Sequence, residues 1–153
     1  MLQLLETEMF SSVASTISNA ANEIISNQTP IMLLAAPSLA GVLSLAPIEA
    51  AMLDSGLPYR RRFKMESPSE GPSIHILGPS HDQGPDFLSA PPRLTISGKI
   101  VEGLQGSSGD FRRGPLTTVT QAHALAQLIS PSGGRVKRLQ PWIISGNWMH
   151  SAL

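Results

Sequence analysis

The chain contains no cysteine and has few charged residues. Asp, Glu, Lys and Arg together make up 14% of its 153 residues. The absence of Cys excludes a disulfide scaffold, a thiol nucleophile, an iron–sulfur cluster and Cys-ligated zinc. A domain of this length buries about 70% of the surface that its unfolded chain exposes, so it can form a core without covalent support.

Basic residues are missing from the first 59 positions. All eleven Lys and Arg lie at or after Arg60, whereas five of the eleven acidic residues lie before it. A half with net charge −5 is therefore joined to a half with net charge +5. The fold must place these halves against each other or present two contrasting faces.

Nothing at the amino terminus indicates a targeting segment. Residues 2–26 have apolar side chains at three- and four-residue steps, which is typical of an amphipathic helix. They lack the basic start and the continuous apolar core of a secretory signal. We expect residues 1–26 to form an amino-terminal helix that packs on a neighbour, and we expect a cytoplasmic protein.

Strand and helix patterns alternate in the next part of the chain. Residues 31–36 form an apolar run typical of a strand covered on both faces. Residues 42–53 have helical spacing and end before Gly56, a suitable helix cap. Residues 57–65 and 73–77 have two further strand patterns. Strand, helix and strand in this order predict a βαβ unit.

The remaining sequence has fewer regular patterns. Residues 93–102 alternate apolar and polar side chains, which predicts a strand, and residues 119–129 form a helix that Thr117 or the residue after it can cap. Residues 78–92 and 103–115 are rich in Gly, Pro and polar residues and are expected to be loops.

Together these patterns predict that residues 27–153 form one α/β domain. We expect a Rossmann-like, mostly parallel sheet with helices on both faces. In such a sheet a ligand binds at the carboxyl ends of the strands.

Residues 31–53 also permit a different interpretation. They contain Glu49 as their only charged residue and precede three arginines, which resembles a transmembrane helix with a positive flank. Pro37, Gly41 and Pro47 divide the segment into a strand-length and a helix-length piece, and a buried Glu would be costly in a bilayer. We therefore prefer a strand and a helix, with no membrane partner, and keep the single span as an alternative.

The layout resembles a known family. An apolar strand, a loop with Gly41, a helix rich in small residues, the run 54–63 and the apolar residues 74–77 follow one another. This order resembles the amino-terminal Rossmann-like part of DHH-family phosphoesterases, in particular the archaeal RecJ-like proteins. Residues 141–148 are similar in outline to an apolar, Gly-containing segment of those proteins. The resemblance spans residues 28–153 and implies a role in DNA replication or repair.

The metal-binding residues of that family are missing. Active members place Asp and His after the strands, where metal ions bound by oxygen and imidazole ligands activate water. Here residues 35–41 contain no Asp, and the sequence Asp-His-His does not occur. The resemblance therefore implies a catalytically silent relative. We assign no catalytic residue and expect no cofactor.

Four residues form a weak candidate metal site. His75, His81, Asp82 and Asp86 supply imidazole and carboxylate groups that could complete a nitrogen and oxygen shell. Their spacing matches no established metal motif. The alternative, which we favour, is that residues 80–86 form a solvated turn in which Asp binds the local backbone.

Basic residues are candidate contacts for nucleic-acid phosphates. On a strand, Arg60 and Arg62 would share one face while Arg61 points to the other. The alternatives are protection of a sheet edge or ion pairs with the acidic half. The candidates are Arg60, Arg61, Arg62, Lys64, Arg112, Arg113, Arg135, Lys137 and Arg138.

Ser38 and Gly41 are candidate phosphate-binding residues. They lie at an expected strand-to-helix turn, where backbone N–H groups can face an anion. The turn has neither a Gly-rich nest nor the Lys of a P-loop. A simple tight connection is therefore the alternative.

We expect a non-catalytic module that binds a protein partner, a second copy of itself or single-stranded nucleic acid in DNA replication or repair. An active phosphoesterase or nucleotide-binding enzyme is an alternative, and it would need carboxylates that converge at the strand ends. A phage-tail-like structural protein is another, and it would have an all-antiparallel sheet.

Overall fold

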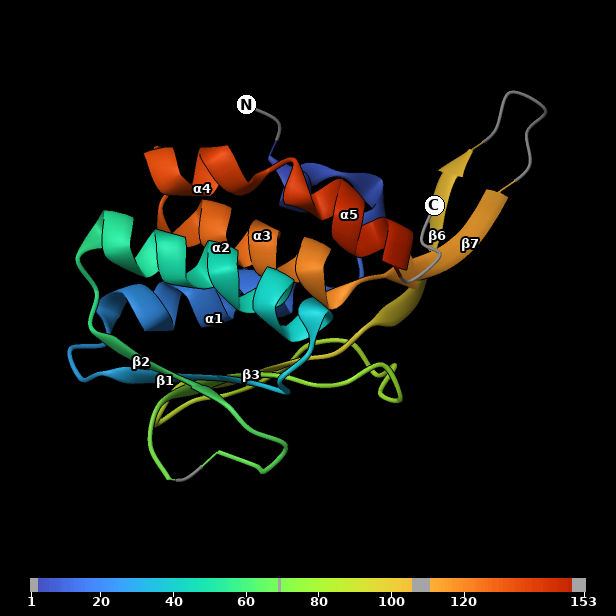
Figure 1. Ribbon diagram of the computed structural model, residues 1–153. Coiled ribbons are helices and arrows are strands. Elements are labelled where there is room, and N and C mark those ends of the chain that lie inside the picture. The colour runs from blue at the N-terminus through green and yellow to red at the C-terminus, as the bar shows by residue number, and fades with distance from the viewer. Residues whose placement is uncertain (1–2, 69, 106–110, 150–153) are drawn as a thin grey trace.

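The computed structural model describes residues 3–68, 70–105 and 111–149. The described elements form a sheet, a layer of helices over it and a two-stranded ribbon that projects from one end (Figure 1). In chain order they are η1 (Leu4–Glu6), η2 (Glu8–Phe10), α1 (Ala14–Ser26), β1 (Ile31–Ala35), α2 (Leu39–Ser55), β2 (Tyr59–Phe63), β3 (Ser73–Ile76), β4 (Asp86–Leu88), β5 (Arg93–Ile96), β6 (Lys99–Gln105), β7 (Phe111–Leu116), α3 (Thr118–Ile129), α4 (Gly134–Leu139) and α5 (Trp142–Met149).

The main sheet has the strand order β2-β1-β3-β5-β4. Its first four strands run parallel, and only β4 at one edge is antiparallel. The predicted Rossmann-like, mostly parallel α/β fold is confirmed. From β1 the chain moves outward to β2 and then returns to the other side of β1 to form β3. This reversal between β1 and β3 is the topological switch point of the sheet.

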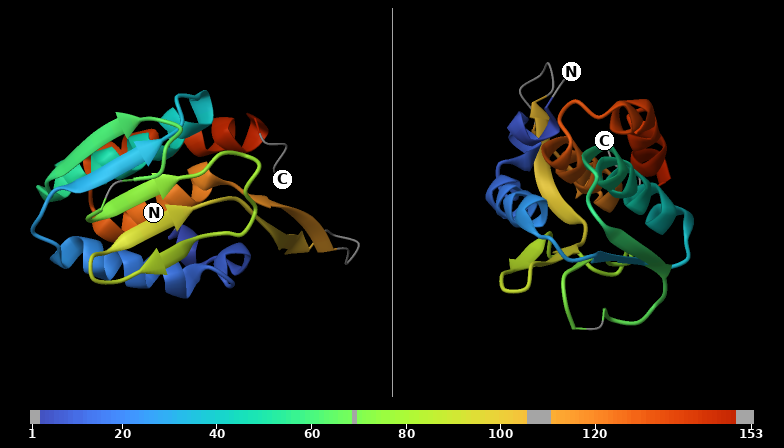
Figure 2. Two further views of the ribbon diagram at one scale, coloured as in Figure 1. Left: turned by 90° about the horizontal axis from the view of Figure 1, so that it is seen from below. Right: turned by 90° about the vertical axis from the view of Figure 1, so that its left-hand side faces the viewer.

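The helices gather on one face of the sheet (Figures 1 and 2), which corrects the expectation of helices on both faces. Leu33, Ile74 and Ile96 on the helix side are fully buried. The opposite face carries exposed arginines from β2 and the half-buried His75. An apolar helix packed on this face would bury these charged groups without partners. Loops lie on this side of the sheet instead of helices (Figure 1).

The amino-terminal segment is not one helix over residues 2–26. Thr7 has an extended backbone (φ −76°, ψ 151°), which separates the 3-10 turns η1 and η2 from each other before α1 begins at Ala14. The apolar periodicity nevertheless marks the buried side chains. Phe10, Ile17 and Ile24 belong to the same hydrophobic cluster as the strands.

Residues 31–53 form a strand and a helix, not one continuous helix. The chain breaks after β1, Ser38 caps α2, and Gly56 ends it in the left-handed conformation (φ 66°). Gly is suited to this cap because it has no Cβ to clash at positive φ. Within the described residues, we find no helix whose length and hydropathy would allow it to span a bilayer.

Three boundaries in the middle of the chain differ from the sequence prediction. The expected loop over residues 78–92 contains β4, and the expected loop over residues 103–115 contains β7. The expected strand over residues 93–102 is split at Ser97 and Gly98, where Ser97 Oγ donates to Gly84 O (2.8 Å). There the chain leaves the main sheet and continues as β6, which pairs with β7 in the projecting ribbon. The parallel main sheet also differs from the all-antiparallel sheet of the phage-tail alternative.

Candidate functional site

A cavity of about 220 Å³ lies at the carboxyl edge of the parallel sheet, at the switch point. Ala36 after β1, Gly78 after β3 and Gly98 after β5 line it. The first residues of α2 and of α3 complete the wall. We call this cavity the switch-point cleft. Open parallel sheets bind their ligands in such a crevice.

The amino-terminal end of α2 forms one wall of the switch-point cleft. Both predicted phosphate-binding residues, Ser38 and Gly41, line it. Ser38 Oγ accepts a hydrogen bond from Gly41 N (3.1 Å). A Cβ on Gly41 would lie 2.3 Å from Ala36 O, so only Gly allows the helix to start this close to β1. The N–H groups of Leu39 and Ala40 belong to the first turn, where a helix offers no acceptor of its own.

The amino-terminal end of α3 forms a second wall. Thr117 caps the helix by accepting from Thr120 N (3.1 Å), and its hydroxyl donates to Asn147 Oδ1 on α5 (2.7 Å). The hydroxyl oxygen of Thr118, Oγ1, lies 3.0 Å from Ser44 Oγ on α2. Ser44 donates its hydroxyl hydrogen to Ala40 O (2.8 Å), so Thr118 is the donor in that pair. These bonds fix the two helix ends beside each other, and both ends carry partial positive charge.

Lys99 also lines the cleft and is the basic residue of its described lining. It is the first residue of β6 and is half-buried. A Cβ on Gly84 would lie 3.0 Å from Lys99 Cδ, so the aliphatic part of Lys99 packs on that glycine. Asp82 lines the same cavity as an exposed acidic residue, next to His81. The described wall therefore combines two helix amino termini and a lysine with one carboxylate.

The predicted metal site is not assembled. His81 and Asp82 line the cleft, but Asp86 lies on the edge strand β4 and His75 lies on β3. Burial, with a smaller effect of His81, lowers the pKa of His75. Among the described residues there is no group of three or more His, Cys, Asp or Glu side chains that could hold a metal ion. The four residues do not meet because His75 and Asp86 lie on two different strands, whereas His81 and Asp82 lie in the loop between those strands.

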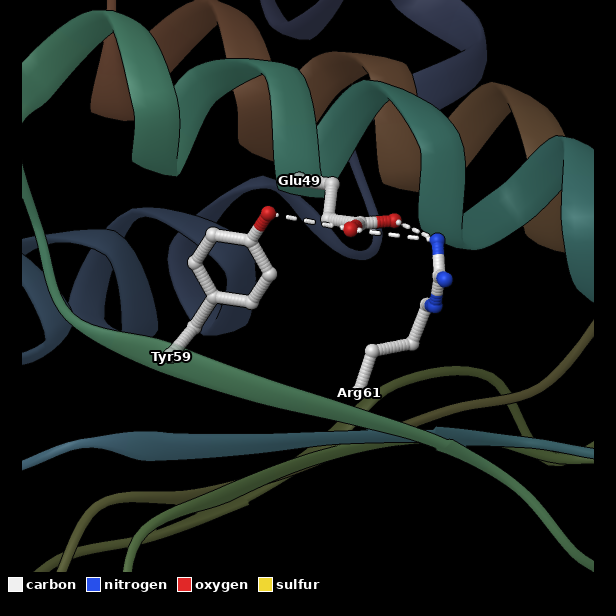
Figure 3. A network of polar contacts seen from close by, with 3 residues as sticks. All are labelled: Glu49, Tyr59 and Arg61. Atoms are coloured by element: carbon white, nitrogen blue, oxygen red, sulfur yellow. Dashed lines mark hydrogen bonds and ion pairs between the residues drawn. The ribbon is translucent and has the colours of Figure 1, made fainter.

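Arg61 is engaged inside the molecule. Its Nη1 lies 2.9 Å from Glu49 Oε2 on α2, and the Tyr59 hydroxyl donates to Glu49 Oε1 (3.0 Å). Figure 3 shows both side chains reaching from β2 toward the helix. The guanidinium carbon also lies 5.5 Å from the centre of the Phe63 ring. Arg61 therefore points away from Arg60 and Arg62, as the alternation predicts, and it is already paired with the acidic half.

The other basic candidates lie on separate parts of the surface. Arg135 on α4 pairs with Asp54 at the end of α2 (2.7 Å), and Lys64 lies 3.9 Å from Glu66. Arg113 is exposed on β7, and Lys137 and Arg138 are exposed on α4, whereas the side chain of Arg112 lies outside the described residues. The structure therefore does not gather the nine candidates into one nucleic-acid interface.

Asp54 connects the acidic half of the chain to α4. Its Oδ2 accepts from Arg135 N (3.1 Å) and Val136 N (3.5 Å), so this carboxylate caps the helix. The hydrogen bond from the Arg135 side chain is the main cause that lowers the pKa of Asp54. The alternative of ion pairing between the two halves is thus confirmed for Arg61 and Arg135.

Sequence reasoning missed Lys99 and Thr118 as cleft residues. Both follow patterns that predicted only local structure: Lys99 lies within an alternating strand pattern, and Thr118 lies beside a helix cap. The rule that could have found them is that the carboxyl ends of parallel strands and the amino termini of the helices that follow lie at the same edge of the sheet.

No protein-family model, curated protein or solved structure matches the chain. The resemblance to DHH-family phosphoesterases stays a prediction, and any functional argument depends on the geometry of the cleft.

Proposed function

We propose that this protein is a binding module that holds a phosphate group in the switch-point cleft. One observation carries the proposal: the amino termini of α2 and α3 meet at a single cavity that Lys99 also lines. Helix amino termini offer free N–H groups and a favourable dipole to an anion. Lysine binds phosphate as a point charge.

The phosphate could belong to a nucleotide or to the end of a nucleic-acid strand. The cavity of about 220 Å³ is smaller than the roughly 300–1,000 Å³ of sites for drug-sized ligands, so it suits a phosphate with a small attached group. Ile76, Ile100 and Pro115 line the cleft and would contact the apolar part of that group. A phosphate at the end of a nucleic-acid strand would agree with the predicted role of a catalytically silent DHH-like module in replication or repair. That role stays part of this proposal.

Calorimetric titration of the full chain tests the proposal. The ligands are inorganic phosphate, a nucleoside, its 5′-monophosphate and a 5′-phosphorylated oligonucleotide. We expect the phosphorylated compounds to bind and the nucleoside to give no heat. Preference for the mononucleotide or for the oligonucleotide identifies the source of the phosphate.

Two variants locate the binding. Lys99→Gln should weaken binding about tenfold, because a charge-assisted hydrogen bond to an anion contributes about 1.5–3 kcal/mol. Lys64→Gln removes the same charge from a residue that does not line the cleft and should leave affinity unchanged. Equal affinity for the nucleoside and its monophosphate, or equal loss in both variants, would contradict the proposal.

A further inference from the structure

Strand β2 forms one edge of the main sheet. It pairs with β1 on one side, and no described strand pairs with it on the other. Lys64 N, just after β2, donates to Ala35 O on β1 (2.8 Å). Because backbone groups alternate between the two sides of a strand, the N–H and C=O groups of Tyr59, Arg61 and Phe63 point away from β1. A row of free groups of this kind can pair with a further strand.

One side of α2 faces this edge. Glu49 on α2 binds Arg61 Nη1 (2.9 Å) and the Tyr59 hydroxyl (3.0 Å), and Figure 3 shows both side chains reaching up to it from β2. Val42 precedes Glu49 by seven residues and Leu53 follows it by four, which correspond to about two turns and about one turn of the helix. The three side chains therefore lie on the same side of α2, the side toward β2.

This side of α2 carries exposed apolar side chains. Val42 is 45% exposed and Leu53 is 54% exposed, and we call these two residues the α2 stripe. They are about 16 Å apart along the helix axis, which is also about the length of the five residues of β2. A strand added beside β2 would therefore place its helix-facing side chains next to the α2 stripe.

The opposite face of β2 is basic. Arg60 and Arg62 alternate with Arg61, so their side chains lie on the face of the sheet that no helix covers. Both are exposed, and neither makes an ion pair within the described part of the chain. Acidic side chains on a neighbouring strand would lie opposite or diagonal to these arginines, at a separation at which opposite charges stabilise the pairing of two strands.

The same arginines disfavour a second copy of the chain. Antiparallel pairing of two β2 strands centred on Arg61 would place Arg61 opposite its own copy and Arg60 opposite Arg62. Like charges directly opposite each other destabilise such a pair. The other edge strand, β4, has three residues and carries Asp86, so it would offer an acidic segment a short edge that repels it. Charge therefore favours β2 as the edge and an acidic segment as its partner.

We infer that the open edge of β2 binds an extended, acidic segment of a partner protein, which joins the five-stranded sheet as a further strand. In this mode of binding, main-chain hydrogen bonds supply affinity and alternate side chains supply specificity. The acidic side chains of the segment face Arg60 and Arg62. The side chains that alternate with them are apolar and contact the α2 stripe.

Fluorescence anisotropy of labelled peptides with the full chain tests the inference. In the first peptide Glu alternates with Val over the length of β2, and in the second Lys replaces every Glu. We expect the acidic peptide to bind, more weakly as salt is raised, and the basic peptide not to bind. Amide hydrogen exchange locates the bound peptide. The N–H groups of Tyr59, Arg61 and Phe63 should become protected, whereas those of Arg60 and Arg62, which point toward β1, should change little.

Two double variants test the side-chain contacts. Arg60→Gln with Arg62→Gln should lower the affinity for the acidic peptide about tenfold, which corresponds to about 1.4 kcal/mol for two exposed ion pairs. Val42→Ser with Leu53→Ser should lower it by a similar factor, because the apolar side chains of the peptide lose their contacts.

Two control variants distinguish this edge from general charge and apolar exposure. Lys137→Gln with Arg138→Gln removes the same charge from exposed residues of α4. Ile25→Ser with Leu88→Ser removes exposed apolar side chains from α1 and β4. Both should bind the acidic peptide as the original chain does, and circular dichroism verifies that every variant is folded.

Several results would overturn the inference. They are the absence of binding of the acidic peptide at low salt, equal binding of the two peptides, and affinity that is unchanged in Arg60→Gln with Arg62→Gln. Protection of β4 in place of β2 would also contradict it. A stable dimer in which the N–H groups of Tyr59, Arg61 and Phe63 are already protected would assign the edge to a second copy instead.

Discussion

A buried histidine should make the stability of this protein depend on pH. His123 in α3 is 1% exposed. Among the described residues, neither of its ring nitrogens has a hydrogen-bond partner. Burial without a partner penalises the charged imidazolium, and it lowers the pKa of His123 from 6.5 to about 4.

The sign and size of the effect follow from proton linkage. Between about pH 6.5 and pH 4 the unfolded chain binds a proton at His123 that the folded chain does not, so acidification favours unfolding. The difference between the two pKa values, at about 1.4 kcal/mol for each pH unit, corresponds to about 3 kcal/mol. This stability is fully present above the unfolded pKa, is lost progressively as the pH falls to about 4, and changes no further below it.

Urea unfolding followed by circular dichroism between pH 7.5 and pH 4 measures the effect. His123→Leu keeps a side chain of similar size without the titrating ring, so its stability should fall less steeply with acidification, by about 3 kcal/mol over the range. At pH 7 this variant should equal or exceed the original chain, since a buried unpaired polar group costs about 1–3 kcal/mol. Parallel pH curves for His123→Leu and the original chain would refute the reasoning.

Three further perturbations test individual contacts. Gly133→Ala should lower the free energy of unfolding by about 1–3 kcal/mol, because its Cβ would lie 2.3 Å from Asp54 Oδ2. Gly134→Ala should raise it by up to about 1 kcal/mol, because a Cβ there meets no described atom within 4 Å. Chemical denaturation compares the two variants. Gly146→Ala should lower the melting temperature because its Cβ meets Val119 at 2.7 Å, and adding Val119→Ala should restore part of the loss; no recovery would contradict the contact. Burial and the hydrogen bond to Glu49 raise the pKa of Tyr59 above 10. Ultraviolet titration of this tyrosine, the only one in the chain, should therefore have a lower midpoint in Glu49→Gln than in the original chain. An unchanged midpoint would contradict the bond.

The first βα unit could be predicted closely because its signals are local. Pro37 ends an apolar strand, Ser38 has a capping side chain, and Gly56 permits the left-handed cap. Each signal acts within a few residues of its own position. The same holds for Thr117, whose side chain caps α3 as the sequence indicates.

The missed elements depend on partners far away in the sequence. β4 is a three-residue edge strand whose pairing with β5 no local pattern specifies, and β7 is a strand because it pairs with β6. The break at Thr7 is similar, because Leu4 N donates to Gln127 Oε1 in α3 (3.0 Å). Tertiary contacts of this kind override a helical periodicity that is otherwise correct.

The candidate site was predicted in part for the same reason. Ser38 and Gly41 lie beside one strand end and can be found from the turn that they form. Lys99 and Thr118 reach the cleft only because the chain leaves the main sheet after β5 and returns through the ribbon to start α3 beside α2. The convergence of two helix amino termini is thus a property of the topology.

Helix α2 links the switch-point cleft to α4. Its amino terminus forms a wall of the cleft, and near its carboxyl end Asp54 accepts the N–H groups of Arg135 and Val136 at the start of α4. The side chain of Asp54 is 8% exposed, and its contact with these N–H groups fixes where α4 begins. Asp54→Asn keeps the side-chain volume and an accepting oxygen but removes the charge that attracts Arg135. We therefore expect it to lower the free energy of unfolding while leaving the phosphate affinity of the cleft unchanged, because the cleft lies at the other end of α2. An equal loss of phosphate affinity would contradict this separation of the two ends of the helix.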